Sequence, residues 1–381
     1  MKILVAPDSF KNSLTAIQVG ESIRKGIMQV PGKWEVRVVP LADGGEGTVE
    51  ALVDATKGVY IETEVFDPLM RPVKARFGIL GTGDGTAVIE MASSSGIELL
   101  KPEEMNPWIT TTYGTGQLIK KALDEGCKEI IIGLGGSATI DGGMGMARAL
   151  GFEFLNGNSA LAGEGGGALS EIVKINVSNA DRRLKDCKII AACDVTNPLT
   201  GPEGASLVYG PQKGADHDIV LQLDVNLKHF ASVIREQLGT EVESVPGSGA
   251  AGGMAAGLMA FAGACLKQGF SLVREIVHLD SHVQWADIVI TGEGKMDFQT
   301  QFGKTPAGVA AVAKKYGKTI IAVTGTLGTG YSDLYKSGFS AVFSVIDRPM
   351  SLEEAIKDAP SLIERCAANI ASFLLIKPLH W

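Results

Sequence analysis

Carboxylates and lysines gather in one glycine-rich stretch, residues 287–309. It reads D-I-V-I-T-G-E-G-K-M-D-F-Q-T-Q-F-G-K-T-P-A-G-V and contains Glu293, Lys295, Asp297 and Lys304. A β-branched run opens the stretch and Thr-Pro begins its last part, which predicts a strand, a polar loop and a helix. Ligands of open α/β sheets bind beyond the carboxyl ends of strands. The loop is therefore suited to a metal and a phosphorylated molecule, or its charges simply face water.

Similar polar loops follow four other predicted strands. Carboxylates hold Mg²⁺, lysines neutralise phosphate, and glycines let a backbone approach closely, so this combination indicates Mg-nucleotide chemistry. For any one of these residues, a surface or turn role is an equally good interpretation. The five loops are Asp8-Ser9-Lys11, Asp43-Gly44-Gly45-Glu46, Asp141-Gly142-Gly143, Asp194-Thr196-Asn197 and Glu293-Lys295-Asp297.

Short nucleotide motifs are weak in this chain. Residues 133–138 and 247–252 both match G-x-G-x-x-G/A, and two matches in a chain with 48 glycines mostly show how permissive the pattern is. Neither match lies in the first strand-helix-strand unit, which disfavours a nicotinamide cofactor. A Walker A loop is also disfavoured, because Phe298 stands where its first glycine belongs.

Composition excludes several classes of protein. The 381 residues are 45% hydrophobic and 20% charged, which predicts a folded chain of two or three domains. A net charge of −8 without a long basic run argues against nucleic acid and anionic membranes as partners. Five cysteines without a CxxC motif are typical of reduced thiols, and no signal peptide is visible, so we expect a cytoplasmic protein. The uncharged stretch 245–266 is rich in Gly and Ala and predicts a buried helix rather than a membrane span.

The elements that must position these loops alternate as in an α/β protein. Strands at 2–6 and 35–41 are each followed by a helix, the first with a capping box formed by Thr15 and Gln18. The pattern then changes to strands at 59–66, 73–80 and 87–91 with short turns, which predicts an antiparallel meander.

The α/β alternation of the N-terminus returns from residue 287 onward. We therefore expect one discontinuous α/β domain, residues 1–72 plus 280–381, formed by both chain ends. Residues 73–279 would be an inserted α/β domain that contains the meander. The region between the strand at 129–134 and residue 185 is expected to be rich in loops.

Seven blocks of the sequence resemble the type 1 glycerate kinases. They cover nearly the whole chain in order and are far more specific than the short motifs. They are A-P-D-S-F-K-N-S-L-T-A (6–16), P-L-A-D-G-G-E-G-T (40–48), D-P-L-M-R-P-V (67–73), G-L-G-G-S-A-T-I-D-G-G-M-G (133–145), C-D-V-T-N-P-L (193–199), Y-G-P-Q-K-G-A (209–215) and T-G-E-G-K-M-D-F-Q-T (291–300).

The resemblance implies an activity and a fold. The expected reaction is ATP-dependent, Mg²⁺-dependent phosphorylation of D-glycerate, with the 2-position favoured, in glyoxylate or sugar-diacid catabolism. The expected fold has two α/β domains around a cleft, one of them a parallel Rossmann- or flavodoxin-like sheet. The sequence does not predict the oligomeric state. A non-catalytic sensor of a small acid and a nicotinamide-dependent dehydrogenase remain the alternatives.

Candidate roles follow from what such a reaction needs: a base, cations for the substrate carboxylate, phosphate contacts and metal ligands. Lys11 and Arg71 are the candidate cations for the carboxylate. The full set is Asp194, Lys11 and Asp8 for catalysis; Arg71, Ser9, Asp43 and Asn197 for the substrate; Gly133, Gly135, Gly136, Ser137, Ser248, Gly249, Lys295 and Lys304 for the nucleotide; and Asp297 and Glu293 for the metal.

Two carboxylates are expected to differ in role. Asp297 lies among Glu293, Lys295 and Lys304, a mixed charged setting that suits Mg²⁺ and phosphates. Asp194 lies in D-V-T-N-P-L, with no lysine nearby in sequence, and a carboxylate without a cation keeps a higher proton affinity. We therefore expect Asp194 to be the base and Asp297 to be a metal ligand.

Overall fold

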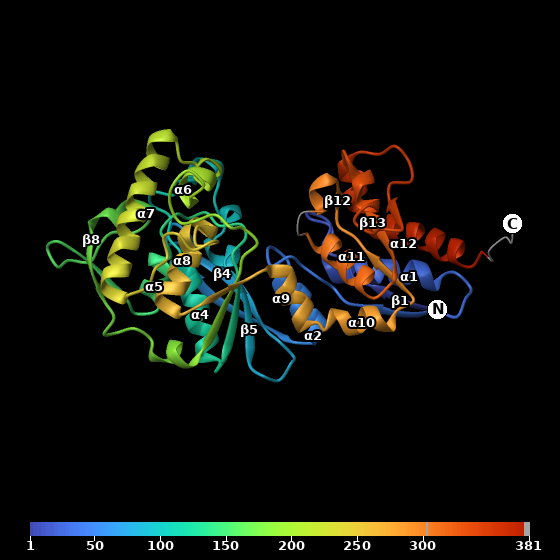
Figure 1. Cartoon of the computed structure of the whole chain (residues 1–381), viewed down its shortest axis with the longest axis horizontal. Helices are drawn as coiled ribbons and strands as arrows, with labels where there is room; N and C mark the ends of the chain where they lie inside the picture. The colour runs from blue at the N-terminus through green and yellow to red at the C-terminus, as the bar shows by residue number, and fades with distance from the viewer. Residues whose placement is uncertain (302–303, 377–381) are drawn as a thin grey trace. The chain divides into compact units, whose positions relative to one another are not determined.

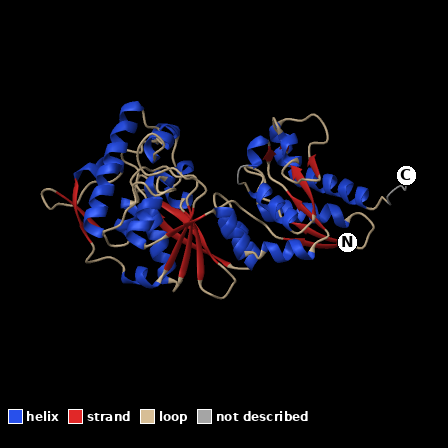
Figure 2. Cartoon of the chain, in the orientation of Figure 1, coloured by secondary structure: helices blue, strands red, loops and turns tan. Residues whose placement is uncertain are grey.

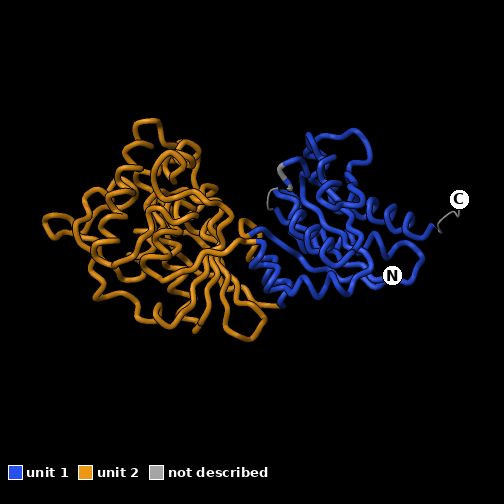
Figure 3. The backbone as a smooth tube through the Cα atoms, viewed as in Figure 1, with its two compact units in different colours: residues 1–43, 50–56, 270–381 blue, residues 44–49, 57–269 orange. Residues whose placement is uncertain are grey.

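The computed structural model describes residues 1–301 and 304–376 and contains two compact units (Figures 1 and 3). Unit 1 comprises Met1–Asp43, Glu50–Thr56 and Phe270–Trp381, and unit 2 comprises Gly44–Val49 and Lys57–Gly269. Both units mix helices and strands, so the α/β class is confirmed (Figure 2).

Unit 1 is built on a fully parallel five-stranded sheet formed by both ends of the chain. The first strand, β1 (Lys2–Val5), pairs with β2 (Glu35–Val38) on one side and with β11 (Ile288–Thr291) on the other. The sheet continues through β13 (Thr319–Thr324) to β15 (Ala341–Ser344), in the order β15-β13-β11-β1-β2. The expected pairing of the two chain ends in one sheet is thus confirmed.

The first helix of this unit begins where the sequence predicted. α1 (Ala16–Met28) has the capping box of Thr15 and Gln18. It packs closely on α12 (Leu352–Leu374), because a Cβ at Gly26 would lie 2.1 Å from the Glu364 carbonyl oxygen. The other elements of this part of the chain are α2 (Thr48–Thr56), α9 (Gly269–Ile276), α10 (Leu279–Trp285), α11 (Thr305–Lys315), the short pair β12 (Lys295–Met296) and β14 (Thr326–Leu327), and the 3-10 turns η6 (Phe298–Gln301) and η7 (Tyr331–Tyr335).

Unit 2 is built on a mixed six-stranded sheet with the order β10-β9-β6-β5-β4-β3. The antiparallel meander is confirmed: β3 (Val59–Phe66), β4 (Pro72–Ile79) and β5 (Thr86–Glu90) pair antiparallel in succession. From β5 onward the pairing is parallel, through β6 (Glu129–Gly133) and β9 (Lys188–Ala192) to β10 (Cys265–Lys267).

Helices and a small hairpin complete unit 2. The region expected to be loop-rich contains α5 (Met144–Ala149) and the antiparallel pair β7 (Glu153–Asn156) and β8 (Ile172–Asn176). The remaining elements are α3 (Ala92–Ser95), α4 (Tyr113–Asp124), α6 (Ala205–Tyr209), α7 (His217–Leu238), α8 (Ala250–Ala262) and the 3-10 turns η1 (Ile97–Leu99), η2 (Pro102–Glu104), η3 (Gly166–Glu171), η4 (Arg182–Asp186) and η5 (Pro211–Lys213).

The unit boundaries differ from the expected positions after residues 72 and 279. The chain enters unit 2 at Lys57, because β3 pairs with β4 along its whole length. It returns to unit 1 at Phe270. The short segment Gly44–Val49 also belongs to unit 2, which the sequence did not indicate.

Each unit has its own apolar core. In unit 1 the core includes Ile3, Ile23 and Ile290, and in unit 2 it includes Phe154 and Phe230. The uncharged stretch that resembled a membrane span forms α8, most of which is buried in the unit 2 core. Among the described residues, no helix is both long and apolar enough to cross a membrane.

Candidate functional site

Three carboxylates of unit 1 follow neighbouring strands. Asp8 follows β1, Asp43 follows β2 and Glu293 follows β11, and the order β11-β1-β2 places these strands side by side. Parallel strands end at one edge of a sheet, so the three side chains gather there. The sequence predicted each loop separately, and the strand order explains why they meet.

The gathered charge changes the acidity of Asp8. Burial, the negative charge of Asp43 and, to a smaller extent, that of Glu293 raise the pKa of Asp8 to about 7. The backbone N–H of Ser9 opposes this by donating to Asp8 Oδ1 over 2.6 Å. Thr305 lies near enough to lower the pKa as well, although its buried hydroxyl makes no hydrogen bond of ordinary geometry with the residues that the structure describes. Asp8 is thus poised to change charge near neutral pH.

The loop after β11 ties its charged residues together through Thr300. Thr300 Oγ1 donates to Glu293 Oε1 over 2.8 Å and accepts from the backbone N–H of Asp297 over 3.2 Å. Lys304 Nζ lies 3.6 Å from Glu293 Oε2, and Lys295 Nζ lies 3.4 Å from Asp297 Oδ2. Burial raises the pKa of Glu293, and its bonds to Thr300 and Lys304 oppose that rise.

This edge of the unit 1 sheet fits a magnesium ion bound with a nucleotide. Mg²⁺ takes one or two carboxylates and otherwise water or phosphate oxygens, so a cage made wholly of protein is not needed. No cluster of three or more metal-binding side chains occurs within residues 1–301 and 304–376. The mutual repulsion of Asp8, Asp43 and Glu293 is the observation in favour, since a divalent cation would relieve it.

The glycine-rich loop of unit 2 begins at the end of β6 and packs against the segment 44–49. A Cβ at Gly133 would lie 2.7 Å from the Gly44 carbonyl oxygen, and one at Gly135 would lie 3.2 Å from the Gly45 Cα. Backbone packing therefore requires glycine at 133 and leaves little room for a side chain at 135, whether or not a phosphate also contacts them. Gly136 is different, because its φ of 70° is itself a left-handed conformation.

This loop is not a dinucleotide-binding turn. In that motif the helix begins directly after the glycines, whereas α5 begins at Met144, well after the end of β6 at Gly133. The intervening residues include Asp141, a fully buried carboxylate that accepts hydrogen bonds from the backbone N–H groups of Thr112, Gly143 and Gly145. Burial raises the pKa of Asp141, and these hydrogen bonds oppose the rise.

Lys213 is a buried charged residue that sequence reasoning missed. Its ammonium donates to Ser137 Oγ over 2.7 Å and to the Thr139 carbonyl over 2.8 Å, with 2% of the residue exposed. Lysine in a Gly-rich, Pro-containing segment is usually solvated, so only its place in the block Y-G-P-Q-K-G-A pointed to it.

Asp194 follows β9 at the same edge as the end of β6, because these two strands are parallel neighbours. It is exposed, and its Oδ1 accepts from the backbone N–H of Gly269 over 2.9 Å. Asn197 is engaged within its own loop: Nδ2 donates to the Glu203 carbonyl and Oδ1 accepts from the Tyr209 hydroxyl. A substrate contact from Asn197 would use the second Nδ2 hydrogen or the second lone pair of Oδ1, so neither bond has to break.

Ser248 and Gly249 lie where α8 begins. A Cβ at Gly249 would lie 2.1 Å from the Pro198 carbonyl oxygen, so this glycine allows α8 to approach the loop after β9. The Ser248 hydroxyl is fully buried and makes no hydrogen bond within the described part of the chain. Such a buried, unsatisfied hydroxyl is unfavourable unless a ligand or water contacts it.

The two candidate cations for the substrate carboxylate differ. Arg71 is paired with Asp67 over 2.6 Å and Glu104 over 2.7 Å, so an incoming carboxylate would have to compete with both. Lys11 is exposed in the loop after β1, close in sequence to Ser9, whose hydroxyl donates to Asp8. Arg71 is exposed as well, so the difference lies in the two carboxylates that already pair with it.

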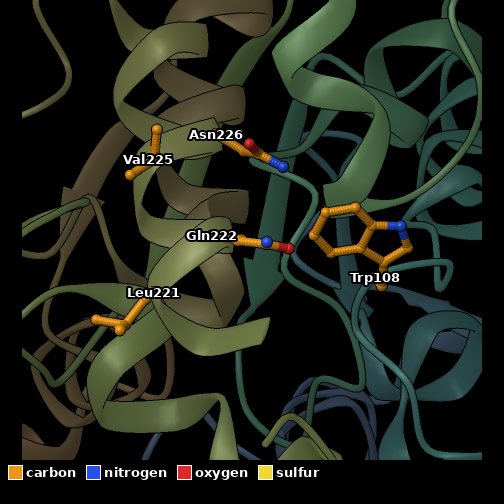
Figure 4. A pocket seen from close by; sticks show the side chains of 5 residues that line it. All are labelled: Trp108, Leu221, Gln222, Val225 and Asn226. Atoms are coloured by element: carbon orange, nitrogen blue, oxygen red, sulfur yellow. The ribbon is translucent and has the colours of Figure 1, made fainter. Parts of the chain in front are cut away.

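The unit 2 surface also has a shallow hollow of about 430 Å³ that contains none of the predicted site residues. Figure 4 shows the indole ring of Trp108 opposite Gln222 and Asn226 of α7. Leu221 and Val225 also line it. Its lining is mainly apolar and holds no ionisable group, so it does not suit phosphate chemistry.

Comparisons with known proteins match the whole chain. Residues 3–375 match the model of the glycerate kinase family. The chain is 50% identical over 369 residues to the glycerate kinase of Halalkalibacterium halodurans, covering 97% of each chain. It is 49% identical over 376 residues to the glycerate 2-kinase of Escherichia coli K12, covering 99% of this chain and 98% of that one. The crystal structure of a candidate glycerate kinase 2 from Salmonella typhimurium LT2 superposes with a TM-score of 0.90 at 46% identity, covering 98% of both chains.

Proposed function

Since this chain belongs to the glycerate kinase family, we propose that it transfers the γ-phosphoryl group of ATP to the 2-hydroxyl of D-glycerate. It is an ATP-dependent kinase whose acceptor is an alcohol group. The observation that carries the proposal is the 49–50% identity to curated glycerate kinases over 97–99% of this chain, with a glycerate 2-kinase among those relatives. The choice of the 2-position follows that relative.

Phosphoryl transfer places most of the catalytic demand on positioning and on neutralising charge. In unit 1, we assign Glu293 and Asp297 as Mg²⁺ ligands and Lys295 and Lys304 as phosphate contacts. Bound Mg²⁺ would neutralise charge on the phosphate oxygens. The support is their common loop, in which Thr300 links the Glu293 carboxylate to the backbone of Asp297 and each carboxylate has a lysine within 4 Å.

The loops after β1 and β2 are assigned to the acceptor. Lys11 would hold the carboxylate of glycerate, because it is an exposed cation beside the Asp8 loop. Ser9 and Asp43 are proposed to contact the substrate hydroxyls as acceptors, since the Ser9 hydroxyl proton is donated to Asp8. Arg71 is kept as a second candidate for the carboxylate, although Asp67 and Glu104 compete for it.

The loops of unit 2 are assigned to the nucleotide phosphates and to the base. Gly133, Gly135, Gly136, Ser137, Ser248 and Gly249 would present backbone amides or hydroxyls to phosphate. Ser248 is supported by its unsatisfied hydroxyl. Asp194 is proposed as the base, with Asn197 shaping its loop, and the raised pKa of Asp8 makes Asp8 the competing carboxylate for that role.

The biological setting is part of the same proposal. The product of a glycerate kinase enters central carbon metabolism, which suits glyoxylate or sugar-diacid catabolism in the cytoplasm. Five cysteines without a disulfide agree with a reducing compartment.

A direct assay separates the proposal from its two alternatives. Purified protein with ATP and Mg²⁺ should release ADP only when D-glycerate is present. A sensor would bind glycerate without ADP release, and a dehydrogenase would change nicotinamide absorbance. Absence of glycerate-dependent ADP from a folded, nucleotide-binding preparation would refute the kinase.

A further inference from the structure

Lys213 is buried although the burial of its ammonium group is unfavourable, and the fold alone does not explain why a lysine stands there. Its ammonium is buried within unit 2, at the end of η5, and is held by Ser137 Oγ and the Thr139 carbonyl. Removing an ammonium from water is costly, and an apolar side chain of similar volume often gives an equally stable or more stable protein. A charge at this position is therefore better explained by what it does to the loop after β6.

The contact fixes how Ser137 can bond. Because Ser137 Oγ accepts from the Lys213 ammonium, the Ser137 hydroxyl proton is left to be donated elsewhere. A hydroxyl in this arrangement is a donor for an anion. The bond to the Thr139 carbonyl restrains the same loop two residues further on.

We propose that Lys213 is a positioning residue that holds the loop from Gly133 to Thr139 in the form that receives a nucleotide phosphate. Lys213 acts through Ser137 and the Thr139 backbone and adds a positive charge behind them. This inference rests on the proposed function, since it deepens the assignment of that loop to the nucleotide.

The arrangement has a measurable consequence for protons. Burial lowers the pKa of Lys213 to about 7, and the negative charge of Asp141 partly opposes that fall. The two groups that accept hydrogen bonds from its ammonium, the Ser137 hydroxyl and the Thr139 carbonyl, are neutral. An arriving phosphate stabilises the charged amine, so binding near pH 7.5 should be accompanied by proton uptake.

Calorimetry of the full-length protein tests this. ADP, in saturating Mg²⁺, is titrated at pH 7.5 in buffers with different ionisation enthalpies, and the number of protons exchanged is obtained from the slope. The wild type should take up a fraction of a proton, and the uptake should shrink at pH 6, where Lys213 is already charged. Asp8, whose pKa is also about 7, can release a proton when Mg²⁺ binds, so the uptake due to Lys213 is the difference between the wild type and Lys213→Met. Equal proton exchange in these two proteins at pH 7.5 would overturn the proposal.

Variants assign the proton to Lys213. Lys213→Met should lose the uptake and weaken ADP binding about ten- to a hundredfold, as expected for loss of a charge-assisted contact. Lys228→Met, at an exposed lysine of α7, is the matched control and should keep both. Lys213→Arg retains the charge and should recover part of the affinity.

The outcomes separate a positioning role from a structural one. If Lys213 serves only the fold, Lys213→Met will change the melting temperature and leave ADP affinity and proton uptake as in the wild type, which contradicts the proposal. A wild type that takes up the proton yet makes no phosphoglycerate would refute the proposed activity and leave the role of Lys213 standing.

Discussion

Asp194 and Asp297 are assigned different roles, so replacing each by asparagine should impair a different property of the enzyme. Asp194→Asn removes the proposed base and should lower kcat by about 10²–10⁴ while nucleotide binding is retained. Asp297→Asn removes a proposed metal ligand and should weaken Mg-nucleotide binding, with partial rescue by excess Mg²⁺. Steady-state kinetics with varied Mg²⁺ and a direct nucleotide-binding measurement check both.

The competing base is Asp8. If Asp8 accepts the proton, Asp8→Asn and not Asp194→Asn will remove an acid limb of kcat centred near pH 7. Wild-type turnover in Asp194→Asn would end its assignment, and a reversed pattern in Asp194→Asn and Asp297→Asn would exchange their roles.

Asp8 also predicts a pH dependence of stability. Its pKa is about 7 in the folded protein and close to 3.8 when unfolded, so the folded state holds a proton that the unfolded state releases between these values. The contribution of Asp8 to stability is therefore fully present below about pH 4 and lost as the pH rises through 7. Asp8→Asn should be more stable than the wild type at pH 8 in EDTA, with the difference shrinking toward pH 4.

Urea unfolding at several pH values measures this effect. Asp358→Asn, which breaks a surface ion pair with Arg348, is the control and should change little. A uniform loss of stability in Asp8→Asn at every pH would contradict the account. Adding Mg²⁺ should stabilise the wild type more than Asp8→Asn, because the cation relieves the same repulsion.

At the scale of elements, strand order decides which loops meet. β1, β2 and β11 are far apart in sequence but adjacent and parallel, so their acidic loops share one edge. In unit 2 the same holds for β6 and β9. The segment 44–49 also packs closely against the end of β6, and this contact depends on glycine at position 133.

Gly133→Ala tests whether this close packing contributes to stability. The new Cβ would lie 2.7 Å from the Gly44 carbonyl oxygen, so the two segments must separate, and we expect a loss of about 1–3 kcal/mol in unfolding free energy. Gly157→Ala is the matched control, because a Cβ there meets nothing within 4 Å, and it should stay within about 0.5 kcal/mol of the wild type. Equal effects of the two changes in denaturant unfolding would contradict the packing argument.

Many of the helices and strands could be predicted from the sequence, because the local sequence patterns agree with the fold. The apolar run at β11, the alternating β-branched and polar residues of β3 and the capping box of α1 specify those elements without long-range information. The hairpin β7–β8 was missed because its strands are short and separated by a glycine-rich loop. The burial of Lys213 could not be predicted, since it depends on a contact with Ser137 that is distant in sequence.

For the site residues too, positions set by local sequence could be predicted, and contacts between distant segments could not. Residues in loops directly after uninterrupted apolar runs, such as Asp8 and Glu293, were recognised because the end of such a run marks the end of a strand. The engagement of Arg71 with Asp67 and Glu104 was invisible, because Glu104 lies in a separate 3-10 turn. Side-chain partners that come from other elements require the tertiary structure.

At the scale of the whole molecule, the apolar core of unit 1 and that of unit 2 should respond separately to a substitution. Ile23→Ala empties part of the unit 1 core, where Ile23 is fully buried, and should cost about 2–5 kcal/mol. Amide hydrogen exchange should accelerate in α1 and β1 and remain near wild type in β6 and β9, which belong to the other core. Equal acceleration in both units would show that they unfold as one.

The central claim is that this glycerate kinase forms 2-phosphoglycerate, and its product can be identified in a single coupled reaction. Enolase dehydrates 2-phosphoglycerate to phosphoenolpyruvate but does not act on 3-phosphoglycerate. With ATP, Mg²⁺ and D-glycerate, the absorbance of phosphoenolpyruvate should therefore rise when enolase alone is added, without phosphoglycerate mutase. A reaction that releases glycerate-dependent ADP but yields phosphoenolpyruvate only after mutase is added would contradict the 2-position, and one that releases no such ADP would contradict the kinase itself.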